Sequence, residues 1–339
     1  MKSSDILAAT RLGFPWPTVD PFLFCAHHHD AYPRGDARMG PQGSLEGRDL
    51  GMDFGRKDGF SMYHGREVPG FPQHPHRGFE TISIVRRGLI DHSDSLGARA
   101  RFGRGDVQWM TAGAGVVHSE MFPLVHQDKE NPVELFQLWL NLPAADKLVE
   151  PYFTMFWRED IPAPVQRDAR GREAQIRLIA GQLDGLRALP PPPNSWANKA
   201  DSDVLIATAD LQPGATFRLP AASPEAKRTV FFYEGDKLEI AGELLDEHAA
   251  LAVKPEVEFT VTAGPYPVGL LVMQGRPIGE PIVQHGPFVM NSREEIQRAI
   301  SDYSRTRFGG WPWPSDAPVH PREQGRFAVH AGGQVEERL

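Results

Sequence analysis

The fold and the chemistry are decided by two short stretches of sequence: QHPHRGFET (73–81) and VVHSEMF (116–122). In the first, His74 and His76 are two residues apart, and in the second His118 and Glu120 repeat that spacing. Side chains at positions i and i+2 of a β-strand point to the same face. Each pair can therefore direct two donor atoms into the interior of a β-barrel.

Together the two pairs would supply three neutral imidazole nitrogens and one carboxylate to a single point. Such a donor set suits a first-row divalent metal ion with positions left open for water, substrate or dioxygen. A structural zinc site more often uses cysteine, and the only cysteine, Cys25, lies far upstream. A single strand histidine is usually just a hydrogen-bonded polar residue, but two such pairs among glycines favour a metal site.

Around these stretches the chain has the pattern of many short strands joined by tight turns. The 33 glycines and 31 prolines among 339 residues would interrupt long helices. Strand-like segments fill residues 81–117 and 133–143, and a second series occupies residues 175–275. Two successive β-rich blocks of similar length predict an all-β chain with a duplicated barrel or sandwich.

Three other segments complete the expected organisation. Residues 142–164 are expected to connect the two β-rich blocks. The segment NSREEIQRAISDYSRTRFGG is the best helix candidate, because Ser292 can cap it with Glu295 three residues later and Gly309 can end it. The proline-rich segment from Trp311 onward is expected to be an irregular tail that wraps the body.

A family resemblance rests on five sequence segments. Within residues 69–147 these are HPHRGFET, HSDSLG, GRGDVQWMTAGAGVVHSEMF and QLWLNLPAADK, and RPIGEPIVQHGPFVMNSREEIQRA follows at 276–299. They closely resemble the pirin family of the cupin superfamily. The resemblance implies two tandem cupin (jelly-roll) barrels with a C-terminal helix. The expected domains are a metal-binding N-terminal cupin, a metal-free C-terminal cupin and an irregular tail: 1–150, 151–310 and 311–339.

In this family the metal is held by the positions that are His74, His76, His118 and Glu120 here, usually as Fe(II). Many other cupins use the glutamate of the pattern HxH-x3-E, which is Glu80 in this chain. Because the pirin carboxylate ligand matches the later glutamate, we expect Glu80 to support the site without binding the metal.

The second β-rich block lacks the metal-binding pattern. Ala226, Lys227 and Arg228 stand where its HxH would be, and His248 is isolated. We therefore expect this barrel to be free of metal, as the resemblance also implies.

Several histidines lie outside the metal motif. His27, His28 and His29 form a run, for which a surface or pocket-edge role is favoured over metal ligation. His64 is equally compatible with lining the pocket and with a plain loop position. His92 is expected to form hydrogen bonds in a turn.

Composition narrows the classes of function. The formal net charge of -8 argues against direct binding to nucleic acid. One cysteine permits no internal disulfide and fits a reducing cytoplasm. The N-terminus shows no signal-peptide pattern, and no stretch of about 18 apolar residues could span a membrane. The prediction is a cytoplasmic protein.

Two functions remain open from the sequence. The first is a dioxygenase of the quercetin 2,3-dioxygenase type, acting with dioxygen on a phenolic substrate, with Glu120 as ligand and base. The second is a non-enzymatic, metal- or redox-sensing regulator that binds a protein partner. The donor set indicates one divalent metal ion per chain. The family resemblance implies Fe(II) as the first expectation, with Mn, Ni, Cu and Zn as alternatives.

Overall fold

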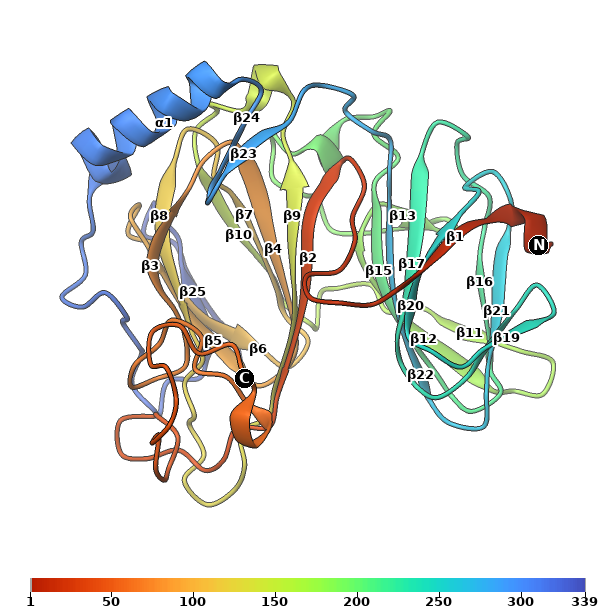
Figure 1. The fold of residues 1–339 in the computed structure, drawn as a ribbon, viewed down its shortest axis with the longest axis horizontal. Helices are drawn as coiled ribbons and strands as arrows, with labels where there is room; N and C mark the ends of the chain where they lie inside the picture. Colours follow the sequence, from red (N-terminus) through yellow and green to blue (C-terminus); the bar gives the residue numbers. More distant parts are fainter. Residues whose placement is uncertain (1, 339) are drawn as a thin grey trace. The chain divides into compact units, whose positions relative to one another are not determined.

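The computed structural model describes residues 2–338 (Figure 1). Its contacts divide the chain into two compact units, each built from two separate segments. Ala26–Arg158 and Glu280–Leu339 form one unit, which we call the N-terminal barrel. Met1–Cys25 and Glu159–Gly279 form the other, which we call the C-terminal barrel.

The two ends of the chain explain why this division is less simple than the expected one of 1–150, 151–310 and 311–339. Near the start, β1 (Ile6–Arg11) pairs with β20 (Ala249–Val253) and so joins the later barrel. Near the end, β25 (Arg326–Val329) pairs with β6 (Arg99–Gly103) and so joins the earlier one. Both pairings link residues more than 200 positions apart, which local patterns do not reveal.

The N-terminal barrel consists of two antiparallel sheets. The first has the strand order β10-β7-β4-β9-β2, with bounds Tyr152–Phe156, Val107–Thr111, Phe79–Arg87, Val133–Asn141 and Phe22–Asp30. The second has the order β26-β25-β6-β5-β8-β3, with bounds Val335–Arg338, Arg326–Val329, Arg99–Gly103, Leu89–Asp94, Val116–Met121 and Gly70–His76. Val85 and Leu135 of the first sheet pack with Ile90 and Phe102 of the second in one apolar core.

The C-terminal barrel repeats this architecture. Its larger sheet has the order β1-β20-β17-β22-β15-β12-β11, with bounds Ile6–Arg11, Ala249–Val253, Lys227–Glu234, Val268–Gly275, Leu205–Leu211, Glu173–Ala180 and Val165–Arg167. Its smaller sheet has the order β16-β21-β18-β19, with bounds Thr216–Leu219, Phe259–Ala263, Leu238–Ile240 and Glu243–Leu245. A hairpin of β13 (Gln182–Leu183) and β14 (Leu186–Arg187) is attached. Buried residues of both sheets, including Ile176, Phe217 and Leu270, fill the space between them.

The expected connector and the expected irregular tail both contain strands. The expected connector holds β10, whose alternate residues Phe153 and Met155 enter the core of the N-terminal barrel. The expected tail holds β25 and β26, which extend the second sheet, with Phe327 and Ala328 buried. The prediction of an irregular tail was wrong, because a neighbouring strand satisfies the backbone groups of a segment rich in turn residues.

The helix prediction is confirmed except at its end. Helix α1 (Arg293–Thr306) begins after Ser292, whose Oγ accepts from the Glu295 amide while the Glu295 side chain accepts from the Ser292 amide. It ends before Gly309, because Arg307 adopts a left-handed φ of 49°. The hairpin of β23 (Val283–His285) and β24 (Phe288–Met290) precedes it. No helix within residues 2–338 is long and apolar enough to cross a membrane.

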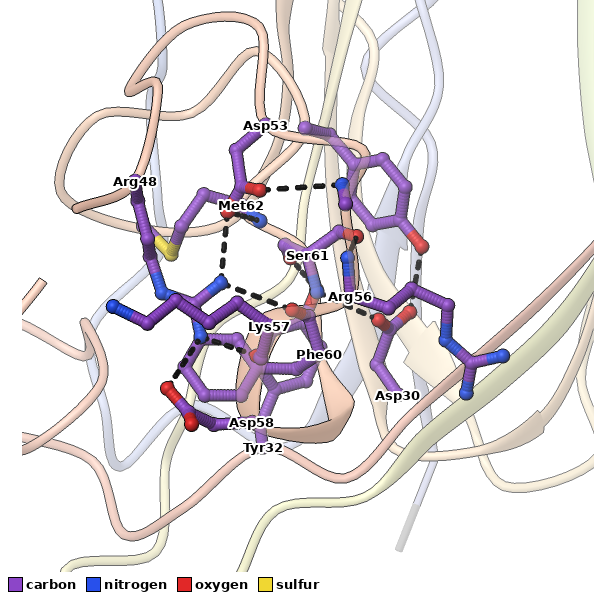
Figure 2. Close-up of polar contacts among 12 residues, drawn as sticks. Asp30, Tyr32, Arg48, Asp53, Arg56, Lys57, Asp58, Phe60, Ser61 and Met62 are labelled. Atoms are coloured by element: carbon purple, nitrogen blue, oxygen red, sulfur yellow. Dashed lines mark hydrogen bonds and ion pairs between the residues drawn. The ribbon is translucent and has the colours of Figure 1, made fainter.

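A long connection between β2 and β3 is fixed by buried charges (Figure 2). Arg48 has only 1% of its side chain exposed, and its Nη1 donates to Asp53 Oδ2 at 2.9 Å and to the Phe60 carbonyl at 3.0 Å. Asp30 accepts from the Tyr63 hydroxyl at 2.7 Å. These bonds hold Tyr63 in place, and its ring stacks on that of Phe71, the second residue of β3.

The C-terminal segment is attached to the second sheet by a buried ion pair. Arg101 donates through Nε and Nη2 to the two oxygens of Asp91, each at 2.7 Å, and both side chains are fully buried. The same guanidinium donates to the carbonyls of His320, Pro321 and Gln324. One charged group of β6 therefore fixes the path of the chain just before β25.

Candidate metal centre

The register of β3 and β8 brings the two sequence motifs together. The strands are antiparallel neighbours, and His74 lies directly opposite His118. Because alternate residues share a face, His76 and Glu120 point to the same side as this pair. The four side chains thus come from two adjacent strands of the second sheet (Figure 1) and face the interior of the N-terminal barrel.

The three histidines form one compact cluster. One ring nitrogen from each of His74, His76 and His118 lies within 4.8 Å of the other two. His118 is fully buried and His76 nearly so, whereas His74 is half-buried and borders the opening. Two donors that each lie about 2.1 Å from one ion are at most about 4.2 Å apart. Small side-chain rotations would therefore suffice to close the cluster on an ion.

The protonation of the cluster suits a cation. Burial lowers the pKa of His74 to about 4 and holds the pKa values of His76 and His118 well below the usual range, with a further contribution from neighbouring histidines. The rings are therefore neutral near pH 7. Nδ1 of His74 lies 2.8 Å from the Pro72 carbonyl, so it carries the hydrogen and leaves Nε2 as a donor.

The surroundings of His118 test whether the cluster fits a metal ion. Both of its ring nitrogens are buried, and neither has a hydrogen-bond partner within the part of the chain that the structure describes. A buried polar atom without a partner is costly. A metal ion bound to the cluster would remove that cost at one nitrogen, so the residues present fit the group.

Glu120 lies at the edge of the cluster. Its Oε2 is 3.9 Å from Nε2 of His118, within the range for two ligands of one ion. Its Oε1 is 2.8 Å from the Ser83 hydroxyl, which also lies 2.7 Å from Oε1 of Gln137. Burial raises the pKa of Glu120, and the Ser83 hydrogen bond partly opposes this shift.

His92 is a neighbour that sequence reasoning placed in a turn. It lies instead in β5, directly opposite Glu120, while Asp94 lies opposite His118. Its ring centroid is 5.5 Å from that of His118, and its Nε2 is 3.2 Å from Asp94 Oδ2. In LIDHSD, His92 and Asp94 lie at positions i and i+2 and so share one face of a strand, and this spacing was the signal that could have found His92.

The opposite side of the site comes from the first sheet. Gln137 and Trp139 of β9 lie opposite Ser83 and Thr81 of β4, so they face the same interior. The Trp139 ring centroid is 5.5 Å from that of His76. Both β9 side chains are half-buried, unlike their neighbours along the strand. The site is therefore open on this side, and sequence reasoning had assigned neither residue to it.

Glu80 does not join the cluster. It is fully buried in β4 and accepts a hydrogen bond from the Thr111 hydroxyl at 2.7 Å. Ser83, three residues further along the strand, faces the cluster, so Glu80 faces the other way. Its bond to Thr111 gives it a structural role in the first sheet, and a supporting role at the metal site stays a prediction.

The histidine run divides between two faces. His27 lies 3.3 Å from Glu134 and stacks on Phe136, whereas His28 is buried edge-on against Tyr63. His29 is exposed. None of the three belongs to the histidine cluster found in residues 2–338.

His64 and His248 are surface residues. His64 is exposed, with Nδ1 2.7 Å from the Gly51 carbonyl, and packs edge-on against Phe71. His248, in the C-terminal barrel, is exposed and lies 2.9 Å from the Gly235 carbonyl. In that barrel Arg228 is buried and bonds to Gln274, so a cation occupies one of the positions where an HxH motif would stand.

A three-histidine cluster inside a two-sheet barrel, with a second barrel of the same kind in the chain, defines a metal-binding tandem cupin. Residues 15–140 match the family described as Pirin, and residues 206–309 match the Pirin C-terminal cupin domain. The chain belongs to the pirin family. The sequence-based predictions of family and fold are thus confirmed.

Known relatives support this assignment over most of the chain. A Pseudomonas aeruginosa protein, provisionally named a quercetin 2,3-dioxygenase, is 37% identical over 70% of this chain and 79% of its own length. Human pirin is 31% identical over 74% of this chain and 81% of its own. The crystal structure of a quercetin 2,3-dioxygenase from Acinetobacter baumannii has a TM-score of 0.70 and 27% identity, covering 90% and 98% of the two chains.

Proposed function

We propose that the protein is a dioxygenase that uses Fe(II) to oxidise a quercetin-like flavonol or another electron-rich phenol. The observation that carries this proposal is the placement of three neutral imidazoles and Glu120 beside a half-open space bordered by Trp139. The similarity to relatives named for quercetin 2,3-dioxygenase activity supports it.

The residues at the metal site would have different chemical roles. His74, His76 and His118 would hold the metal through neutral nitrogens. A bound metal ion would polarise a phenolic oxygen and orient dioxygen. Glu120 would hold the proton released from the phenol at Oε2, and burial raises the pKa of its carboxyl above the usual range. Ser83 orients that carboxylate through Oε1.

The surroundings fit a flat aromatic substrate. Trp139 packs against Phe79 with ring centroids 4.4 Å apart, and Phe71 lies 6.3 Å from the His74 ring. Aromatic side chains offer large apolar faces to a planar ring system. Gln137, half-buried beside Ser83, offers a polar group for a substrate hydroxyl.

Aerobic turnover of quercetin by the Fe(II)-loaded chain tests the proposal. We expect loss of flavonol absorbance with an equal amount of dioxygen consumed, and loss of both in His118→Ala. His248→Ala is the matched control, because this exposed histidine lies in the other barrel, and it should keep full activity. No turnover of quercetin or simpler catechols by iron-loaded protein would refute the enzyme proposal.

The same experiment decides between the two functions left open by the sequence. A chain that binds iron and turns over no phenol would favour the regulatory alternative, with a protein partner. The proposal includes a cytoplasmic location, which the single buried cysteine and the need for Fe(II) both favour.

A further inference from the structure

A cavity in the N-terminal barrel lies apart from the histidine cluster. Its volume is about 410 Å³, within the usual range for small-molecule sites. It is formed by the turn from β4 to β5, the turn from β6 to β7, and the loop after β8. We call it the turn cavity; its lining is Arg86, Arg87, Gly88, Leu89, Arg104, Pro123, Val125, His126, Lys129, Glu130, Asn131, Pro132 and Val133.

Apolar side chains separate the turn cavity from the metal site. Val133 belongs both to the cavity lining and to the core of the barrel. Phe122, Leu135 and Phe102 pack in the same core. The chain passes from Glu120 in β8 to the core residue Phe122 before it reaches the cavity lining at Pro123. The cavity is therefore not a continuation of the proposed substrate site.

The turn cavity is cationic in an anionic protein. Arg86, Arg87, Arg104 and Lys129 line it, against Glu130 and the nearly buried Glu134 behind it. Four positive groups against Glu130, Glu134 and the neighbouring Asp128 leave a local charge of +1, whereas the whole chain carries -8.

Three of these cations have groups available for a ligand. Glu134 binds Arg87 only through Nε, at 3.4 Å, which leaves both terminal nitrogens without a hydrogen-bond partner among residues 2–338. Arg104 and Lys129 form no ion pair with any residue from 2 to 338. Lys129 and Arg104 both act on His126, whose pKa is lowered by burial first and then by these two positive charges, while Asp128 opposes the shift. The three cations come from three separate loops around one cavity.

The loops that carry these cations are well fixed. Asn131 accepts from the His126 amide and donates to three backbone carbonyls of the surrounding loops. In the β6–β7 turn, Asp106 accepts from the Gly103 amide at 2.9 Å. A side chain at Gly103 would collide with the carbonyl of Gly88, so the two turns are in direct contact. Fixed loops lower the entropy cost of binding.

The turn cavity also has an apolar lining. Leu89, Val125 and Val133, together with two prolines, line it alongside the cations. Inorganic anions would use only the cations, whereas a ligand with an apolar body would use both kinds of lining. We propose that the turn cavity binds a small organic anion of the aromatic carboxylate class.

Binding of benzoate to the full chain, measured by saturation-transfer NMR and calorimetry, tests the proposal. We expect a Kd of about 1 mM, in keeping with a ligand of roughly nine non-hydrogen atoms. Inorganic phosphate and neutral benzyl alcohol should each bind at least about fivefold more weakly, because each uses only one part of the cavity. Equal binding of phosphate, or no saturable benzoate binding up to about 20 mM, would overturn the proposal.

A pair of matched variants locates the site. Arg104→Gln with Lys129→Gln should weaken benzoate binding about tenfold, without changing the melting temperature, because both side chains are exposed. Arg298→Gln with Lys237→Gln removes the same charge elsewhere and should change nothing. Equal weakening by both pairs would show general attraction and contradict the site. His118→Ala should keep benzoate binding, and its loss there would assign benzoate to the metal centre instead.

Discussion

The buried pair of Arg101 and Asp91 allows a quantitative prediction. Asp91→Asn removes the negative partner and leaves a fully buried guanidinium, and breaking such a pair costs about 3–5 kcal/mol. Arg101 keeps its backbone carbonyl partners, so we expect the lower end, about 3 kcal/mol. For a domain of this size that loss lowers the melting temperature by roughly 6–12 °C. Differential scanning calorimetry measures it.

Two further variants decide whether the reasoning is correct. Glu173→Gln breaks the exposed pair with Arg167 and should cost at most about 1 kcal/mol. Adding Arg101→Met to Asp91→Asn removes the unpaired charge and should restore part of the stability. If Asp91→Asn costs no more than Glu173→Gln, or if the double variant is no more stable than the single one, an unpaired buried charge is not the cause.

Three other predictions concern single side chains. Ser83→Ala frees the Glu120 carboxylate and should weaken metal binding about tenfold, measured by competition with a chelator. His28 has a pKa of about 3 when folded, so the unfolded chain takes up its proton first as pH falls below about 6.5. Stability should therefore fall with decreasing pH by up to about 1.4 kcal/mol per unit, and His28→Leu should flatten that slope in urea titrations. Lys147 is buried and its Nζ donates to three oxygens, so Lys147→Met should cost about 2–4 kcal/mol by chemical denaturation.

Each of these has a clear contrary result. Unchanged chelator competition in Ser83→Ala would show that the serine does not orient Glu120. An identical pH slope in His28→Leu would show that His28 does not titrate differently in the two states. A loss below about 1 kcal/mol in Lys147→Met would mean that water satisfies the three oxygens.

The sequence predicted those features that depend on local spacing. The i, i+2 pairs revealed which side chains share a face, and the capping box of Ser292 and Glu295 marked the start of α1. Strand segments bounded by glycine and proline also appear where expected. Each of these signals lies within a few residues of its effect.

Features set by tertiary pairing could not be predicted in the same way. The strand β25 forms because β6, more than 200 residues earlier, supplies its hydrogen bonds. Glu80 fits a general cupin pattern, but the register of β4 turns it away from the cluster. Trp139 and His92 border the metal site only because their strands face or adjoin β8. The register between these strands cannot be read from a single sequence.

The central claim is that His118 and its neighbours bind one metal ion. The most direct test is the iron content of the chain after anaerobic loading with Fe(II) and removal of free metal, measured by elemental analysis. We predict about one iron per chain for the wild type and for His248→Ala, and close to none for His118→Ala. A wild-type content near zero, or a His118→Ala content equal to the wild type, would contradict the claim.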